Sequence, residues 1–237
     1  MTFISNAFKL LISCSIIKTI YFNFKVLPFQ RAIKIPFFIG KKVRLRRIGK
    51  INLTYTGKKK IHIGTVLMFN TSSNMETIWE NNGQITIEGP LMIAPSAVIH
   101  TGEKGHLIFN GKNRIGAHTY ILCHSLVSIG FNTGISWHVQ ICDTDFHFFK
   151  NIDTNKVSQL VRPIEIGQNV WIGNHVIVSK GVKIADGCIC GMNSMITKNC
   201  DIQNSLLIGT PAQSKATRVA RIFDIKEEKE LLENRTV

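Results

Sequence analysis

The 237-residue sequence predicts an all-β solenoid of short strands, with a helical segment before it and a helix after it. Aliphatic residues recur at every sixth position in its C-terminal half, a period that suits neither an α-helix nor an alternating strand. The formal net charge of +14 lies in the first 60 residues, and an amphipathic pattern follows the last repeat. With 44% hydrophobic residues the chain can bury a continuous core, which excludes a disordered protein.

Residues 1–60 form a basic, Phe-rich N-terminal segment that we expect to be helical. They contain 14 Lys and Arg residues and no acidic residue, whereas residues 61–237 contain 15 residues of each sign. Because the excess positive charge lies outside the predicted solenoid, a fold with a basic surface for reading nucleic acid is not predicted. No nucleic-acid partner is expected.

This N-terminal segment interleaves lysines with half of the Phe residues of the chain, which are Phe3, Phe8, Phe22, Phe24, Phe29, Phe37 and Phe38. Such a composition is typical of a segment that lies on an anionic membrane surface. The alternative is a helix over residues 3–27 that packs on the solenoid or on another copy of it. Lys9, Lys18 and Lys25 interrupt the long apolar stretch, so a membrane-spanning helix is not predicted.

The protein is expected to work in the cytoplasm, at the inner face of the membrane if the N-terminal segment binds lipid. The sequence lacks the basic start and the small-residue cleavage site of a signal peptide. Six cysteines do not make a disulfide framework in a chain of this length, which favours a reducing compartment.

Residues 61–215 are the predicted solenoid. The first position of its six-residue units holds Ile166, Ile172, Val178, Ile184, Cys190, Ile196, Ile202 and Ile208, and the second position is usually small. Each unit supplies a short strand, a tight corner and one buried side chain, and stacked coils bury a continuous column. The same register, with one slip, runs over residues 87–141. Three cysteines occupy buried positions of the register and are interpreted as small hydrophobic residues.

Three segments depart from the repeat. A loop over residues 148–163 interrupts it directly after His147, and residues 41–85 show one coil-like piece, at Ile63. After the last repeat, apolar residues recur with helical spacing. We expect residues 216–237 to form a C-terminal helix that caps the end of the solenoid.

The repeat resembles that of the hexapeptide-repeat acyltransferases, in which an aliphatic and a small residue precede two variable positions, a small residue and a variable one. The resemblance covers about residues 85–215. Within it, Ser-Trp at 136–137, Asp-Thr-Asp-x-His at 143–147 and Val-Trp-Ile-Gly at 170–173 are most similar to bacterial sugar and polysaccharide O-acetyltransferases. Gly-Thr-Pro-Ala near the C-terminal end fits the same family.

This resemblance implies a left-handed parallel β-helix with three hexapeptides per turn, an exception to the usual handedness of parallel crossovers. It implies a homotrimer with active sites between subunits. It also implies an acetyl-CoA-dependent O-acetyltransferase that acts on a sugar hydroxyl of a cell-surface glycan or its precursor. Acetyl-CoA is then a co-substrate, and no metal is expected.

The expected catalytic residues are Asp143, Asp145 and His147. They alternate along the chain, so on an extended backbone their side chains face the same way. Transfer to a hydroxyl needs a general base, and a histidine oriented by a carboxylate meets that need. The resemblance assigns the base to His147, for which the alternative is a structural loop histidine. Either Asp145 or Asp143 orients it.

The resemblance also implies a cofactor site and an acceptor site. The residues it brings toward acetyl-CoA are Trp171, Asn174, Met192, Ser194, Thr197, Lys198, Lys215, Arg218 and Arg221, the last group as cations for the phosphates. The acceptor candidates are Trp137, His138 and His124, and each has an ordinary surface role as its alternative. His118 and His138 are 20 residues apart and are expected to stack on one face.

Three other functions fit parts of the sequence. A carbonic anhydrase of the γ type uses this fold, but its three zinc-binding histidines have a spacing that this chain does not match. A non-catalytic scaffold that docks through its basic segment is a second alternative. The third is an N-acetyltransferase that acts on an amino sugar or a serine-type acceptor.

Overall fold

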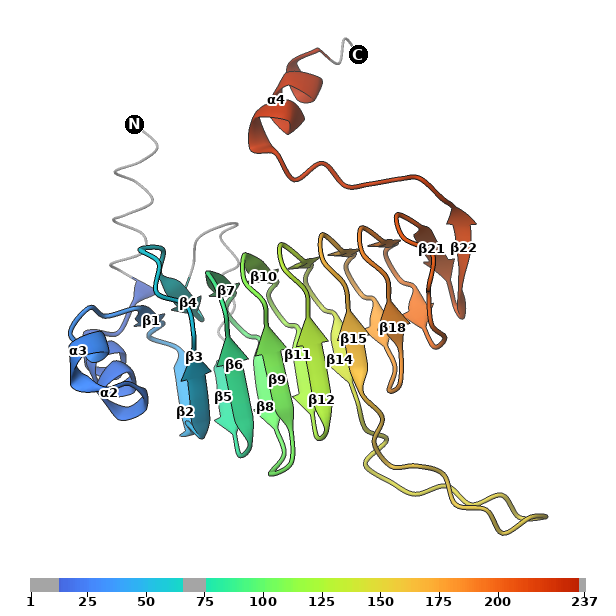
Figure 1. Cartoon of the computed structure of the whole chain (residues 1–237), viewed down its shortest axis with the longest axis horizontal. Coiled ribbons are helices and arrows are strands. Elements are labelled where there is room, and N and C mark those ends of the chain that lie inside the picture. Colours follow the sequence, from blue (N-terminus) through green and yellow to red (C-terminus); the bar gives the residue numbers. More distant parts are fainter. Residues whose placement is uncertain (1–12, 66–75, 235–237) are drawn as a thin grey trace.

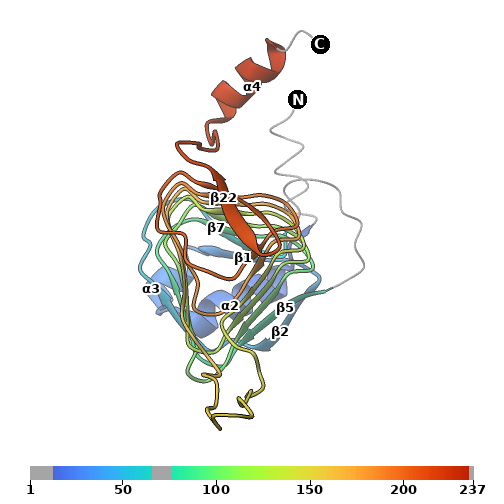
Figure 2. The ribbon, with the colours of Figure 1, turned by 90° about the vertical axis from the view of Figure 1, so that its right-hand side faces the viewer.

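The computed structural model describes residues 13–65 and 76–234, so residues 1–12 of the predicted N-terminal segment lie outside it. The described chain forms a parallel β-helix with two helices at its N-terminal end and one after its last strand (Figure 1). Viewed along its axis, three sheets enclose a common core (Figure 2). This is the solenoid that the repeat predicts, in the left-handed β-helical form that the resemblance implies.

Among the described residues, the strands of each coil join three sheets in turn. The first sheet contains β1 (Phe37–Ile39), β4 (Ile61–Ile63), β7 (Leu91–Ile93), β10 (Asn113–Ile115), β13 (Gly134–Ile135), β16 (Trp171–Ile172), β19 (Ile189–Cys190), β21 (Leu206–Gly209) and β22 (Ala212–Ala216). The second contains β2 (Val43–Arg47), β5 (Thr77–Asn81), β8 (Val98–Thr101), β11 (Tyr120–Cys123), β14 (Gln140–Cys142), β17 (Ile177–Val178) and β20 (Met195–Ile196). The third contains β3 (Lys50–Leu53), β6 (Gln84–Ile87), β9 (His106–Phe109), β12 (Leu126–Ile129), β15 (Ile164–Ile166) and β18 (Lys183–Ile184).

Aliphatic residues at the first repeat position form the buried column that the sequence predicts. On the first sheet, Ile93, Ile115, Ile135 and Ile172 pair in parallel register from coil to coil, and all four are buried. The three cysteines predicted at inner positions are buried as well, which confirms their role as small hydrophobic residues. Burial of one such side chain per strand stabilises each coil only against its neighbours.

The repeat ends earlier than predicted. Ile202 and Ile208, the last two residues assigned to the first position, are exposed, while Ser205 and Leu207 are buried. Cys190 pairs with Leu207, so the last coil is one residue shorter than three hexapeptides. A one-residue slip turns every side chain to the opposite face of a strand.

The predicted domain boundary at residue 61 is wrong, because the solenoid begins at β1. Strands β1, β2 and β3 supply one strand to each sheet and form the first coil. Val43 points into the core, whereas Arg44 and Arg47 lie outside. Much of the basic character of residues 41–50 therefore covers the outer surface of this coil rather than a helical arm.

The N-terminal end of the β-helix is closed by α2 (Ile16–Val26) and α3 (Phe29–Ala32). The ring of Phe22 lies 5.1 Å from that of Phe37 and 5.7 Å from that of Trp79. The Asn23 side chain donates to the carbonyl of Phe37 at 2.9 Å and accepts from its N–H at 3.1 Å. These contacts cover the edge of β1, whose backbone groups would otherwise lack partners. Within the described ranges, no helix is long and apolar enough to cross a membrane.

The loop and the C-terminal segment leave the solenoid on different sides. The predicted loop lies between β14 and β15 and folds back on itself through the bridges Thr144–Val161 and Lys150–Val157. The C-terminal helix, α4, spans Ile225–Glu233 and begins later than predicted. It does not cap the end of the solenoid as expected, because β22 turns back on β21 there and the chain then runs back along the first sheet (Figure 1).

Candidate active site

A cavity of about 590 Å³ lies between the outer face of the first sheet and the C-terminal segment. Its floor comes from successive strands: Met92 from β7, Arg114 from β10, Gly134 from β13 and Trp171 from β16. These residues follow one another in register, so their side chains project on the same face. The opposite wall is formed by Arg221, Ile222, Phe223 and Glu228.

A cation–aromatic pair holds the two walls together. The guanidinium carbon of Arg221 lies 3.6 Å from the centre of the Trp171 ring. A Cβ at position 134 would come within 2.9 Å of the Trp171 ring, so only glycine lets the indole lie flat on the sheet there. Burial lowers the pKa of Arg221, and nearby Arg114 lowers it further, while Glu228 opposes the shift. The cavity thus contains a partly desolvated cation beside an aromatic ring.

Three histidines form a ladder at the corner between the first and second sheets. The rings of His118 and His138 stack at 4.7 Å, which confirms the predicted stack, and His175 extends it at 4.8 Å from His138. All three residues have left-handed backbone conformations at the turn. Burial and the two neighbouring rings lower the pKa of His138. His118, His138 and the half-exposed Trp137 line the rim of the cavity.

The predicted catalytic residues lie at the corner between the second and third sheets, where the loop leaves the solenoid. Asp143 is buried, and its carboxylate accepts hydrogen bonds from the backbone N–H groups of His124 and Ser125, both at 2.7 Å. Asp145 forms an ion pair with Lys180. Asp143 therefore fixes the turn from which the loop starts.

His147 is exposed and makes no hydrogen bond or ion pair with any residue in the described ranges. The expectation that Asp143, Asp145 and His147 face one way does not hold, because the backbone is not extended. Phe146 has φ +59°, which turns the chain between the second aspartate and the histidine. Neither carboxylate contacts His147 in the single chain.

His124 lies beside this turn rather than beside the cavity. Its ring packs on His100 at 5.2 Å and against the edge of Phe146 at 5.1 Å. Its Nε2 atom is buried and has no hydrogen-bond partner among the described residues. Burial lowers the pKa of His124, His100 adds to the shift, and Asp143 opposes it. The imidazole is thus favoured in its neutral form.

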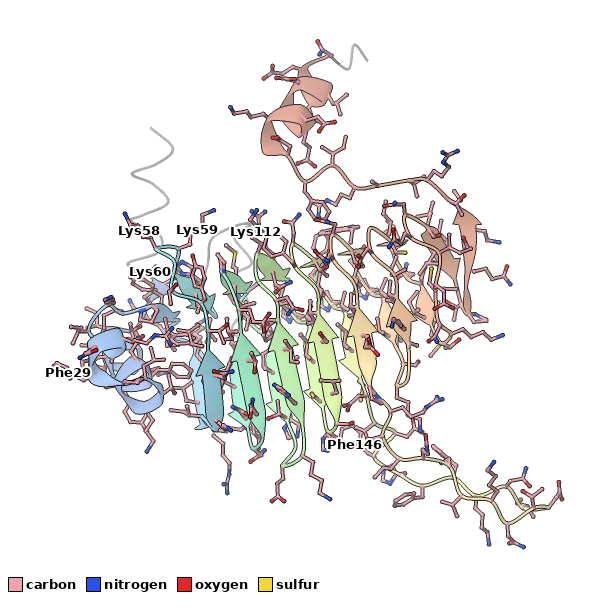
Figure 3. All side chains as sticks on the ribbon, in the orientation of Figure 1. Phe29, Lys58, Lys59, Lys60, Lys112 and Phe146 are labelled. Carbon is pink, nitrogen blue, oxygen red and sulfur yellow. The ribbon has the colours of Figure 1, made fainter. Side chains whose placement is uncertain are left out.

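The cavity and His147 lie on opposite sides of one chain. The cavity occupies the first sheet, whereas His147 follows β14 of the second sheet and precedes β15 of the third, at the corner facing away from the first. The end view shows the loop and α4 on opposite sides of the solenoid (Figure 2). Lys112 lies on the side of the C-terminal segment and Phe146 on the side of the loop (Figure 3). One chain therefore cannot bring His147 to its own cavity.

Two of the predicted cofactor residues, Trp171 and Arg221, lie in the cavity. The others do not line it: Asn174, Met192, Ser194, Thr197, Lys198, Lys215 and Arg218. Ser194 is buried, and its hydroxyl accepts from the N–H of Gly209 at 3.1 Å. Asn174 lies at the corner next to the histidine ladder, where its carbonyl accepts from the N–H of Asn193.

The sequence interpretation missed Arg114 and Lys112, which add cations to the cavity. A signal for Arg114 was present in the repeat. It precedes Ile115 as Trp171 precedes Ile172, and this shared register places both side chains outside on the first sheet. Among the residues that the structure describes, no three His, Cys, Asp or Glu side chains are grouped as metal ligands would be.

No protein-family model matches the chain. Individual proteins of known sequence and structure are similar to it, as follows. An uncharacterized 24.8 kDa protein in the cps region of Klebsiella pneumoniae is 30% identical over 200 residues, which are 84% of this chain and 86% of that protein. Galactoside O-acetyltransferase of Escherichia coli is 30% identical over 127 residues, 54% of this chain and 58% of that protein.

Among solved structures, the polysialic acid O-acetyltransferase OatWY matches with a TM-score of 0.53 and 17% identity. The match covers 81% of this chain and 94% of that one. The structural similarity to OatWY therefore covers most of the fold.

Proposed function

Because the chain belongs to the hexapeptide-repeat acyltransferase family, we propose that it transfers an acetyl group from acetyl-CoA to a sugar hydroxyl of a cell-surface glycan or its precursor. The Escherichia coli relative is named for O-acetyl transfer to galactosides, which supports a sugar acceptor. The observation that carries the proposal is the cavity in which Arg221 lies on Trp171.

This cavity has the chemistry that an acyl-CoA requires. Its cations, Lys112, Arg114 and Arg221, suit the phosphates, because charged hydrogen bonds to phosphate are strong and directional. Apolar side chains such as Met92 and Ile222 suit the long pantetheine arm. Arg114 contributes to lowering the pKa of Arg221 after burial, so a bound polyanion would relieve the repulsion between the two guanidinium groups.

In this proposal His147 is the general base. It takes the proton of the sugar hydroxyl as the hydroxyl oxygen attacks the acetyl carbonyl carbon, and it returns the proton to the sulfur as the carbon–sulfur bond breaks. A backbone N–H group or the Asn174 side chain stabilises the charge that develops on the carbonyl oxygen. Asp145 is available to orient His147 only after it leaves Lys180, whereas Asp143 is held by two backbone amides.

A homotrimer supplies what one chain lacks. Because the cavity and His147 lie on opposite sides of the chain, a complete site requires His147 of one copy beside the cavity of the next. Closed rings of copies built from one repeated contact satisfy this geometry at every site. In such a site Trp137 and His138, at the cavity rim, and His124, beside the loop, approach the acceptor from two different copies.

Replacing Arg221 with Ala is expected to weaken CoA binding by roughly tenfold or more, since a hydrogen bond to a charged group contributes about 1.5–3 kcal/mol. Replacing Trp171 with Ala removes the ring on which Arg221 lies and is expected to weaken CoA binding as well. Isothermal titration of the full-length protein with CoA measures the effect. Arg44→Ala is the matched control, because Arg44 is an exposed arginine on the second sheet that pairs with Glu76. Unchanged affinity in both cavity variants would show that CoA binds elsewhere.

A further inference from the structure

Helix α2 exposes most of its apolar residues, and two of its three buried residues, Thr19 and Asn23, are polar. Ile16 and Ile17 are 75% and 82% exposed. Together with further exposed side chains of α2 and α3 they form what we call the end face, which consists of Ile16, Ile17, Ile20, Tyr21, Phe24, Phe29 and Ile33. A surface helix usually packs its whole apolar stripe on a core, whereas α2 fully buries only Phe22 of its apolar residues.

The first coil of the solenoid determines which side of α2 is buried. Thr19 and Asn23 of α2 are buried because their side chains bond to the backbone of β1: the Thr19 hydroxyl accepts from the N–H of Ile39 at 3.0 Å, and Asn23 bonds both backbone groups of Phe37. These bonds fix the rotation of α2. Its isoleucines therefore face away from the solenoid.

The exposed residues of α2 and α3 form one continuous surface. The rings of Phe24 and Phe29 lie 5.9 Å apart and join the two helices. Phe29 points away from the solenoid at its N-terminal end (Figure 3). An exposed apolar surface of this kind marks an interaction site.

The surroundings of the end face are cationic. Lys25 and Lys34 are exposed on the same two-helix unit, and Lys58 and Lys59 lie at the same end of the molecule (Figure 3). Lys60 donates to the carbonyls of Lys34 and Ile35, which holds the Lys58–Lys60 turn beside α3. The first acidic residue of the chain is Glu76.

We propose that the end face docks the protein on an anionic lipid bilayer, with α2 lying in the plane of the interface. Apolar side chains flanked by lysines match the acyl boundary and the anionic headgroups of such a surface. A second copy of the chain is a poor occupant, because it would bring two cationic, acid-free ends together. This proposal does not depend on the acyl-transfer reaction.

Vesicle flotation of the full-length protein tests the proposal. We expect binding to vesicles of phosphatidylcholine with phosphatidylglycerol, weaker binding to phosphatidylcholine alone, and release by salt. The double variant Ile17→Ser/Phe29→Ser is expected to lose roughly tenfold or more of this binding. Ile152→Ser, at an 88% exposed isoleucine of the loop, is the matched control and should bind normally.

A second variant separates charge from fold. Lys25→Glu/Lys34→Glu keeps every apolar residue of the end face and is expected to lose the preference for anionic vesicles, with an unchanged melting temperature. Binding that is equal for both vesicle types, or equal losses in the Ile152 control, would overturn the proposal. So would an absence of vesicle binding combined with a mass in light scattering that falls in the double variant, because the end face would then join copies of the chain.

Discussion

Replacing His147 with Ala is expected to lower the rate of acetyl transfer by roughly 10²–10⁴-fold, the usual contribution of a general base. The side chain is exposed and makes no bond with the described residues, so its removal should leave folding and assembly unchanged. The rate of CoA release in the presence of acceptor gives the effect on turnover, and light scattering gives the assembly state.

The matched control for this prediction is His106→Ala. His106 lies on β9 of the third sheet, where its Nε2 is 2.9 Å from the Thr86 hydroxyl, and it does not line the cavity. Its loss should leave turnover within a few-fold of the wild type. A His147→Ala protein with near-normal turnover would remove His147 from the proposed reaction and return it to the role of a loop residue.

Replacing Trp79 with Ala is expected to destabilise the N-terminal coils by about 3–5 kcal/mol, the usual cost of removing a large buried aromatic side chain. Trp79 is fully buried, contacts Phe22 of α2 and donates from Nε1 to the carbonyl of Ile48 at 3.4 Å. Its loss opens a cavity beneath the helices that close the solenoid.

Hydrogen exchange of the backbone amides in β1 and β2 is the appropriate measurement, because the coils of a solenoid unfold locally. Trp137→Ala provides the control. Trp137 is 47% exposed, so the loss of its side chain should leave hydrogen exchange of the β1 amides nearly unchanged. Unchanged protection of β1 in Trp79→Ala would mean that the hydrogen bonds of α2 to Phe37 and Ile39 and the packing of Phe22 on Phe37 hold the helix without Trp79.

The coils after residue 87 could be predicted because aliphatic residues or cysteine recur at the first position of their six-residue units, as at Ile172 and Cys190. The first coil could not. Its outer positions carry Arg44 and Arg47, and its strands are joined by connections that break the period of six. The charge of these residues therefore obscures the repeat, and the sequence alone predicts a basic arm where the first coil lies.

Only part of the candidate site could be predicted, because two of the nine expected cofactor residues line the cavity. Trp171 and Arg221 share one cavity as the resemblance implies, yet the contact between them depends on the path of the C-terminal segment. His147 is separated from the cavity because the loop leaves the solenoid at the corner between the second and third sheets. The turn at Phe146 results from the positive φ of that residue. Neither the corner at which the loop leaves nor the turn at Phe146 can be predicted from residue types or their spacing.

The most direct test of the account is the chemical identity of the product. The full-length protein is incubated with isotope-labelled acetyl-CoA and a panel of glycans that includes amino sugars, and the products are analysed by mass spectrometry before and after mild alkali. We expect one labelled acetyl group on a glycan, which alkali removes as an ester, and we expect its transfer to require both His147 and Trp171. A label that resists alkali as an amide, or CoA binding without transfer to any glycan, would contradict this expectation.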